Sequence, residues 1–214
     1  MKIAKAVVGS LGTNCYFLMN DAGEVLIVDP ADTDPVRLEQ FVRNQGLKPL
    51  AVLLTHGHFD HILCAPELAG LLSVPVCALD AERALLSDPE GNCSAGYGRT
   101  RICVLPDRFF TPDEDVTMGH FSFRVLHTPG HTAGSCCFWF PEDKVLVCGD
   151  TLFRGSFGRT DLATGNGAQI EASVVRLLTE LPEDTVCLPG HGPETTVELE
   201  RNINPFGYLV ERTE

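Results

Sequence analysis

Features that would assign this chain to several other classes of protein are missing from its 214 residues. No segment approaches the roughly 20 consecutive apolar residues of a transmembrane helix. The nine cysteines are odd in number and include no Cys-x-x-Cys pair, so we expect buried, reduced thiols. The N-terminal segment has neither the long apolar run nor the cleavage site of a signal peptide, and we therefore expect a cytoplasmic protein.

Basic residues are also scarce. Lys and Arg total 16 against 29 Asp and Glu, which gives a net charge of −13. Such a surface repels phosphate backbones, so we expect no nucleic-acid partner, and we expect no membrane partner either. Hydrophobic residues at 44% and charged residues at 21% are ordinary for a globular protein. No linker divides the chain, and we predict one domain over residues 1–214, as a monomer or a small homo-oligomer.

What is present is a series of short apolar segments that end in turns. Apolar runs and alternation predict strands over residues 15–19, 25–28, 50–54, 121–126, 135–140, 144–148 and 186–188. Apolar residues at helical spacing predict helices over residues 35–44 and 170–181. Four of the strands run into a turn that carries His56, His131, Asp150 or His191. Functional loops gather at such strand ends, so we expect these side chains to share a site.

The turn after residue 54 holds four potential metal ligands in Thr55-His56-Gly57-His58-Phe59-Asp60-His61. Imidazole nitrogen and carboxylate oxygen suit zinc, iron and manganese. Residues two apart in an extended turn share a side, so His56 and His58 can face one ion while Asp60 and His61 reach a second. Burying these groups without partners would be costly. The full set exceeds the needs of one tetrahedral ion, and we predict two divalent ions held by His56, His58, Asp60, His61, His131, Asp150 and His191.

This pattern resembles the signature of the metallo-β-lactamase superfamily, in which Thr-His-x-His-x-Asp-His precedes a separate His, an Asp and a further His. Three later segments are similar to those of the glyoxalase II-like hydrolases in that superfamily: His127-Thr128-Pro129-Gly130-His131-Thr132, Gly149-Asp150-Thr151-Leu152-Phe153 and Gly190-His191-Gly192-Pro193. The resemblance spans residues 10–206. It implies an α+β fold, a four-layer αββα sandwich with the site at one edge of the paired sheets.

The resemblance also implies a role for each ligand. It divides them between a first and a second metal, held respectively by His56, His58 and His131 and by Asp60, His61 and His191. Asp150 matches the carboxylate that bridges the two ions. Zinc is the ion that we expect, with iron or manganese as alternatives that the same donors accept.

The implied reaction is hydrolysis by a metal-bridging hydroxide, because a zinc ion lowers the pKa of bound water from ~15.7 to ~7. We predict a thioester substrate such as S-D-lactoylglutathione, or a related small acyl compound, with Asp60 and Asp150 as catalytic residues. Arg154 and Arg159 lie in the glycine-rich loop of residues 154–161. We predict that they bind a substrate carboxylate, which the guanidinium fork suits, with Arg159 the better candidate.

Two departures from the glyoxalase II pattern bear on the substrate. Those enzymes carry a C-terminal helical region that supplies basic residues for glutathione, and this sequence has no counterpart before Glu214. Arg159-Thr160-Asp161 also stands where those enzymes have a lysine followed by aromatic residues. Both departures argue against a glutathione thioester and leave the hydrolytic ligands untouched.

Three other interpretations share part of the pattern. A persulfide dioxygenase-like oxidoreductase has a similar Gly-Arg-Thr-Asp loop but uses one iron and oxygen. A phosphodiesterase or nuclease of the same superfamily is disfavoured by the net charge. A non-catalytic metal-binding protein would not need the complete ligand set. We interpret His120 and His127 as non-ligands, and residues 92–101 as a flap over the site.

Overall fold

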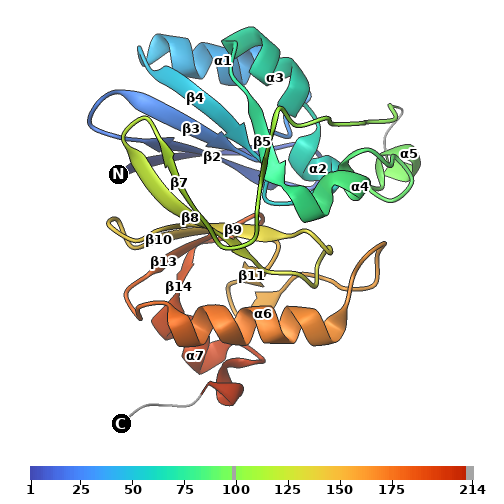
Figure 1. The fold of residues 1–214 in the computed structure, drawn as a ribbon, viewed down its shortest axis with the longest axis vertical. Coiled ribbons are helices and arrows are strands. Elements are labelled where there is room, and N and C mark those ends of the chain that lie inside the picture. The colour runs from blue at the N-terminus through green and yellow to red at the C-terminus, as the bar shows by residue number, and fades with distance from the viewer. Residues whose placement is uncertain (98–99, 211–214) are drawn as a thin grey trace.

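The first of two stacked sheets contains the N-terminal half of the chain (Figure 1). The structure is a computed structural model that describes residues 1–97 and 100–210. The sheet has the order β1-β2-β3-β4-β5-β6, antiparallel from β1 to β3 and parallel from β3 to β6. Its strands are β1 (Lys2–Val8), β2 (Thr13–Met19), β3 (Glu24–Val28), β4 (Lys48–Leu53), β5 (Val76–Leu79) and β6 (Arg108–Phe110).

The second sheet contains the later strands in the order β14-β13-β10-β9-β8-β7. Only β10 and β13 pair in parallel among the described strands of this sheet. Its strands are β7 (Glu114–Met118), β8 (Phe121–His127), β9 (Cys136–Phe140), β10 (Val145–Gly149), β13 (Val186–Pro189) and β14 (Thr195–Thr196). A short hairpin of β11 (Leu152–Phe153) and β12 (Ser156–Phe157) follows β10.

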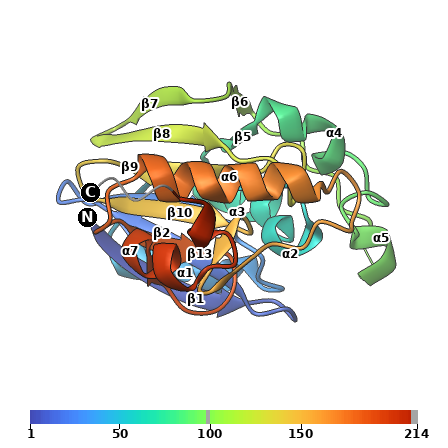
Figure 2. The same ribbon diagram turned by 90° about the horizontal axis from the view of Figure 1, so that it is seen from below.

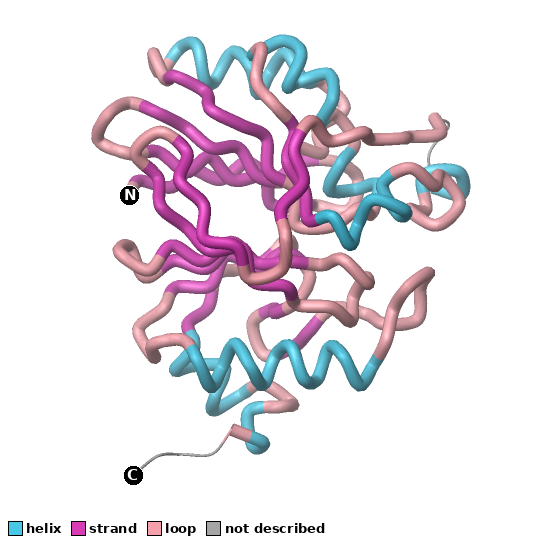
Figure 3. Tube along the Cα trace, in the orientation of Figure 1, coloured by secondary structure: helices cyan, strands magenta, loops and turns pink. Residues whose placement is uncertain are grey.

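Helices cover the outer face of each sheet (Figures 1, 2 and 3). The first sheet is covered by α1 (Pro35–Asn44) and α3 (Ala65–Leu72), and the second by α6 (Gly167–Glu180) and α7 (Val197–Ile203). The connections contain α2 (Phe59–Ile62), η1 (Asp80–Glu82), α4 (Arg83–Leu86) and α5 (Ser94–Tyr97), and η2 (Gly207–Leu209) follows α7. This is the four-layer αββα fold that the resemblance implied, so the fold prediction is confirmed.

Three apolar layers hold the four structural layers together. Leu38 and Leu68 of the outer helices pack on the first sheet. Phe123 and Phe138 meet between the sheets, with ring centroids 5.9 Å apart. Leu177 of α6 lies in the layer against the second sheet. Strands buried on both faces must be apolar at nearly every position, which explains the unbroken apolar runs in β3 and β10.

Two predicted helices form close to the expected residues. Asp34 accepts a hydrogen bond from the backbone N–H of Val36 and caps α1, and Gly46 follows the helix with a φ of 64°. Asn166 caps α6 in the same way, so this helix begins three residues before the predicted start. Such caps fix where each helix begins, and hence where the preceding loop must end.

Several elements were not predicted from the sequence, among them α3, β5 and α7. α3 is apolar on most of its surface, and β5 has only four residues, so neither gives a clear period. The predicted flap contains α5, although residues 98–99 lie outside the described part of the chain. No helix in the described ranges is long and apolar enough to cross a membrane. Seven of the nine cysteines are buried and all are unpaired.

Candidate metal centre

The predicted ligands come together where strands of both sheets end. β4 runs into the loop of His56 and His58, and β8 leads to the loop of His131. β10 and β13 end just before Asp150 and His191. The backbone N–H of Asn14 donates to Gly190 O at 2.7 Å, which joins the first sheet to the His191 turn. The stacking of the two sheets therefore closes one site from loops that are far apart in the sequence.

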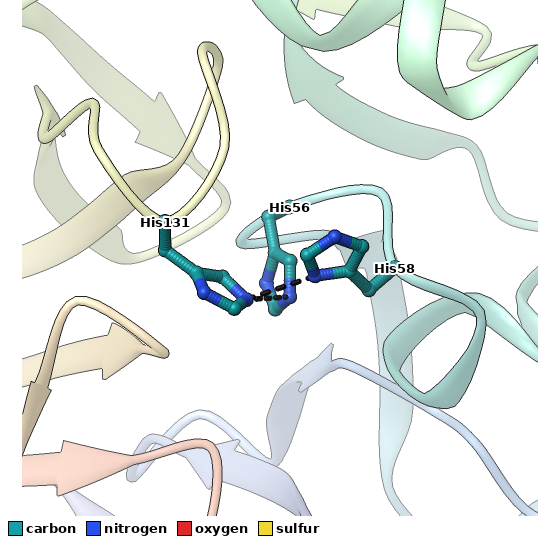
Figure 4. A group of neighbouring side chains, drawn as sticks. All are labelled: His56, His58 and His131. Carbon is teal, nitrogen blue, oxygen red and sulfur yellow. Dashed lines mark hydrogen bonds between the residues drawn. The ribbon is translucent and has the colours of Figure 1, made fainter. Parts of the chain in front are cut away.

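The first cluster consists of three histidine rings (Figure 4). His131 Nε2 lies 2.8 Å from His58 Nδ1 and 3.2 Å from His56 Nε2. All three residues are buried. Burial, together with the neighbouring histidines, lowers the pKa of His58 to about 3 and lowers that of His56 as well. Uncharged imidazoles whose lone pairs converge in this way form a set of nitrogen donors for a cation.

The second cluster is formed by Asp60, His61 and His191. His191 Nε2 lies 3.2 Å from Asp60 Oδ2 and 3.3 Å from His61 Nε2. Burial would raise the pKa of Asp60, but His61 and His191 hold it below its ordinary value, so the side chain is a carboxylate. Two nitrogens and a carboxylate oxygen at this spacing are again a donor set for a divalent metal.

Asp150 lies between the two clusters. Its Oδ1 is 3.3 Å from His61 Nε2 in the second cluster, and its Oδ2 is 3.5 Å from His131 Nε2 in the first. Oδ1 is buried and makes no hydrogen bond to any described residue. A buried carboxylate oxygen without a hydrogen bond is costly, and a cation beside it would remove that cost. The residues present therefore fit the binding of metal ions.

The outer ring nitrogens of three histidines are held by hydrogen bonds. His61 Nδ1 donates to Asp29 Oδ2 at 2.8 Å, and His131 Nδ1 donates to the backbone oxygen of Arg159 at 2.8 Å. His56 Nδ1 lies 3.1 Å from the hydroxyl of Thr55. A proton fixed on Nδ1 leaves the lone pair of Nε2 pointing into the clusters, as metal-ligating histidines require. Sequence reasoning missed Asp29 and the Arg159 carbonyl.

A cavity of about 230 Å³ adjoins both clusters. Leu11, Phe59 and Leu162 form an apolar part of its lining, and Cys93 and Arg159 also line it. Cys93 belongs to the predicted flap, so that segment does border the cavity. A larger hollow of about 480 Å³ near Asp32 and Arg101 contains none of the clustered ligands, and we place the site at the smaller one.

The two arginines of the glycine-rich loop differ in their surroundings. Arg159 lines the cavity, and its guanidinium donates to both carboxylate oxygens of Asp161, at 2.7 and 2.8 Å. Arg154 is exposed and is not among the described residues that line the cavity. His120 and His127 also lie outside this lining, where His120 donates a backbone N–H to Glu24 and His127 Nε2 contacts Ala133 O.

The fold and the clustered ligands define a metallo-hydrolase. The sequence matches the metallo-beta-lactamase superfamily over residues 8–191, and the chain belongs to this superfamily. It is 38% identical to the probable metallo-hydrolase YqgX of Bacillus subtilis, over 96% of this chain and 97% of that protein. It is 33% identical to the hydroxyacylglutathione hydrolase GloC of Haemophilus influenzae, over 96% and 98% of the two chains.

Solved structures show the same fold. The BLEG-1 B3 metallo-beta-lactamase superposes with a TM-score of 0.90 at 39% identity, covering 96% of this chain and 99% of that one. TTHA1623 in a di-iron-bound form superposes with a TM-score of 0.83 at 37% identity, covering 95% and 99%. The TTHA1623 structure holds iron, so the fold alone does not select zinc.

Proposed function

We propose that this chain is a dinuclear metallohydrolase that cleaves a thioester or a related acyl bond in a small molecule. The observation that carries the proposal is the pair of three-donor clusters beside one cavity, with the carboxylate of Asp150 between them: Oδ1 lies beside His61, and Oδ2 lies 3.5 Å from His131 Nε2 and 3.6 Å from His191 Nε2. The di-iron form of TTHA1623 supports two ions per chain. One domain, a cytoplasmic location and a monomeric or small homo-oligomeric state stay predictions.

The first metal would be held by His56, His58 and His131, and the second by Asp60, His61 and His191. Asp150 would bridge them. Zinc is our proposal for both positions, and iron or manganese would accept the same donors. Two such ions, when bound, supply a hydroxide nucleophile near neutral pH and polarise the carbonyl of the substrate.

The chain's own residues prepare this chemistry. The pKa of Asp60 lies below its ordinary value, so its carboxylate can accept a hydrogen bond from a water molecule and orient it toward the substrate. Phe59 and Leu162 give the cavity an apolar part of its lining, against which the acyl group of a substrate can pack. Arg159 reaches the same cavity and provides a positive charge for a substrate carboxylate, with Asp161 fixing its plane.

The substrate class is inferred from the cavity and from a relative. A volume of about 230 Å³ suits the acyl part of a small molecule better than a polymer. GloC, a hydroxyacylglutathione hydrolase by name, supports S-D-lactoylglutathione as the first compound to test. The net charge of −13 supports a small-molecule substrate over a nucleic acid.

A substrate panel with metal analysis tests the proposal. The chain, purified without added metal, is analysed for bound elements and assayed on S-D-lactoylglutathione, on simpler acyl thioesters and on a chromogenic β-lactam. We expect two metal ions per chain and chelator-sensitive thioester hydrolysis. One iron per chain with oxygen uptake on glutathione persulfide would overturn the hydrolase in favour of a dioxygenase. Exclusive β-lactam turnover would overturn the substrate class.

A further inference from the structure

Glu82 is a buried carboxylate outside the two clusters. It ends η1, directly after β5, and its exposed fraction is 1%. Both of its oxygens are used: Oε1 accepts the backbone N–H of Gly57 at 2.7 Å, and Oε2 accepts that of Gly134 at 2.8 Å. A carboxylate is rarely buried this far from solvent unless it is paired, and here each oxygen is paired with a backbone amide.

The two amides lie in the two loops that form the three-histidine cluster. Gly57 lies between His56 and His58, and Gly134 lies in the turn that follows His131. These loops leave different sheets and face each other across the cluster (Figure 4). One carboxylate therefore joins the two chain segments that carry the three histidine rings.

Close packing leaves this carboxylate little freedom. A Cβ atom at Gly134 would lie 2.3 Å from the backbone nitrogen of Glu82 and 2.4 Å from its Oε2. A Cβ atom at Gly57 would lie 3.2 Å from Oε1. Burial raises the pKa of Glu82 to about 6, although the hydrogen bonds from Gly57, Thr132 and Gly134 oppose this rise. At neutral pH the Glu82 side chain is therefore a charged carboxylate that is held in one position by packing and by its hydrogen bonds.

We propose that Glu82 is a positioning residue that holds the His56–His58 loop and the His131 loop at the separation that the first metal requires. The inference rests on the proposed dinuclear function. It predicts a selective effect, because Asp60 and His61 of the second cluster are fixed by other contacts. Phe59 N donates to Asn92 O at 2.9 Å, and His61 is held by Asp29.

The test uses Glu82→Gln in the full chain. The amide of Gln has one oxygen, so its NH₂ group must face either Gly57 N–H or Gly134 N–H, and one loop loses its anchor. Glu24→Gln is the matched control. Glu24 is also buried, accepts the backbone N–H of His120 at 2.8 Å beside Gly119, and joins β3 to the β7–β8 turn. That turn lies at the end of the sheets opposite α2, which carries Asp60 and His61 (Figure 1).

Cobalt(II) is titrated into each metal-free protein, and visible spectra follow each equivalent. We expect two equivalents in the wild type and in Glu24→Gln. In Glu82→Gln we expect one equivalent to bind about tenfold or more weakly, with an altered spectrum, while the other is unchanged. Wild-type affinity for both equivalents in Glu82→Gln, or equal weakening of both relative to the wild type, would overturn the inference. A wild type that never binds two equivalents would instead overturn the proposed function.

A measurement on the wild type covers the case in which Glu82→Gln does not fold. Amide hydrogen exchange of the metal-free protein reports directly on the two backbone amides. We expect Gly57 and Gly134 to be protected even without metal, because Glu82 already holds both. Exchange of either amide at the rate of an exposed loop would contradict the positioning role.

Discussion

Replacing Asp29 by Asn should weaken metal binding at both clusters through a change of proton positions. Asp29 Oδ1 accepts Thr55 N–H at 2.8 Å, and Oδ2 accepts the Thr55 hydroxyl at 2.6 Å and His61 Nδ1–H at 2.8 Å. Because the Thr55 hydroxyl donates to Asp29, it is free to accept the Nδ1 proton of His56. One carboxylate thus sets the tautomers of His56 and His61.

In Asp29→Asn, the amide oxygen can keep Thr55 N–H, which leaves the NH₂ group facing the Thr55 hydroxyl and His61 Nδ1. The Thr55 hydroxyl oxygen and His61 Nδ1 must then each accept a hydrogen bond from this NH₂ group, so the proton of His61 moves to Nε2. The Thr55 hydroxyl now donates its own proton to His56 Nδ1, so the proton of His56 also moves to Nε2. The backbone tolerates the change, since Asn adopts the φ of 51° found at Asp29. Loss of such a partner costs about 10- to 100-fold in metal affinity, or about 1.4–2.8 kcal/mol, at each site.

Competition with a chromophoric chelator measures both affinities. Asp32→Asn is the control, because Asp32 is buried in the same connection and binds Arg37 and the backbone of Asp34 without contacting a histidine. We expect wild-type affinities in Asp32→Asn and weaker binding of both equivalents in Asp29→Asn. Unchanged affinities in Asp29→Asn would refute the tautomer argument, and equal weakening in both variants would assign the effect to charge alone.

Three further outcomes are expected. Gly190→Ala should lower kcat/KM at least about hundredfold, because the added Cβ would lie 2.2 Å from Asp150 Oδ1 and 2.6 Å from His61 Cε1 and would displace these side chains. Near-normal turnover in this variant would show that both side chains can shift without loss of function. Arg159→Ala should raise KM about tenfold and largely spare kcat, because the backbone oxygen that holds His131 remains; a loss confined to kcat would contradict a binding role. Burial raises the pKa of Glu82 to about 6 in the folded chain, against a value of ~4.3 in the unfolded chain. The protonated side chain therefore contributes stability that is complete below pH ~4.3 and is lost as the pH rises through 6. The metal-free wild type should lose about 2 kcal/mol of unfolding free energy relative to Glu82→Gln over this range, and parallel curves of unfolding free energy against pH for the two proteins would contradict this pKa shift.

Much of the site could be predicted because its ligands stand at the ends of apolar strands. His56, His131, Asp150 and His191 each follow a run whose composition is fixed by burial, and such runs are local features of the sequence. The clustering of these side chains follows once the sheets are stacked.

The supporting residues could not be predicted in the same way. Asp29 follows a predicted strand, but its role depends on a positive φ and on Thr55, which lies in the loop after the neighbouring strand β4. Glu82 belongs to an unpredicted connection after β5, and its partners are backbone amides that carry no side-chain signal. The backbone carbonyl of Arg159, which accepts the hydrogen bond from His131, likewise gives no signal in the sequence, although Arg159 was predicted for its side chain. Tertiary contacts, and not local patterns, define these roles.

The dinuclear assignment is tested most directly by titrating zinc into the metal-free chain while thioester hydrolysis and bound metal are measured together. We expect activity to rise to a plateau at two equivalents per chain, and we expect Asp150→Ala to abolish the second equivalent or nearly all turnover. A plateau at one equivalent, with full activity in Asp150→Ala, would contradict it.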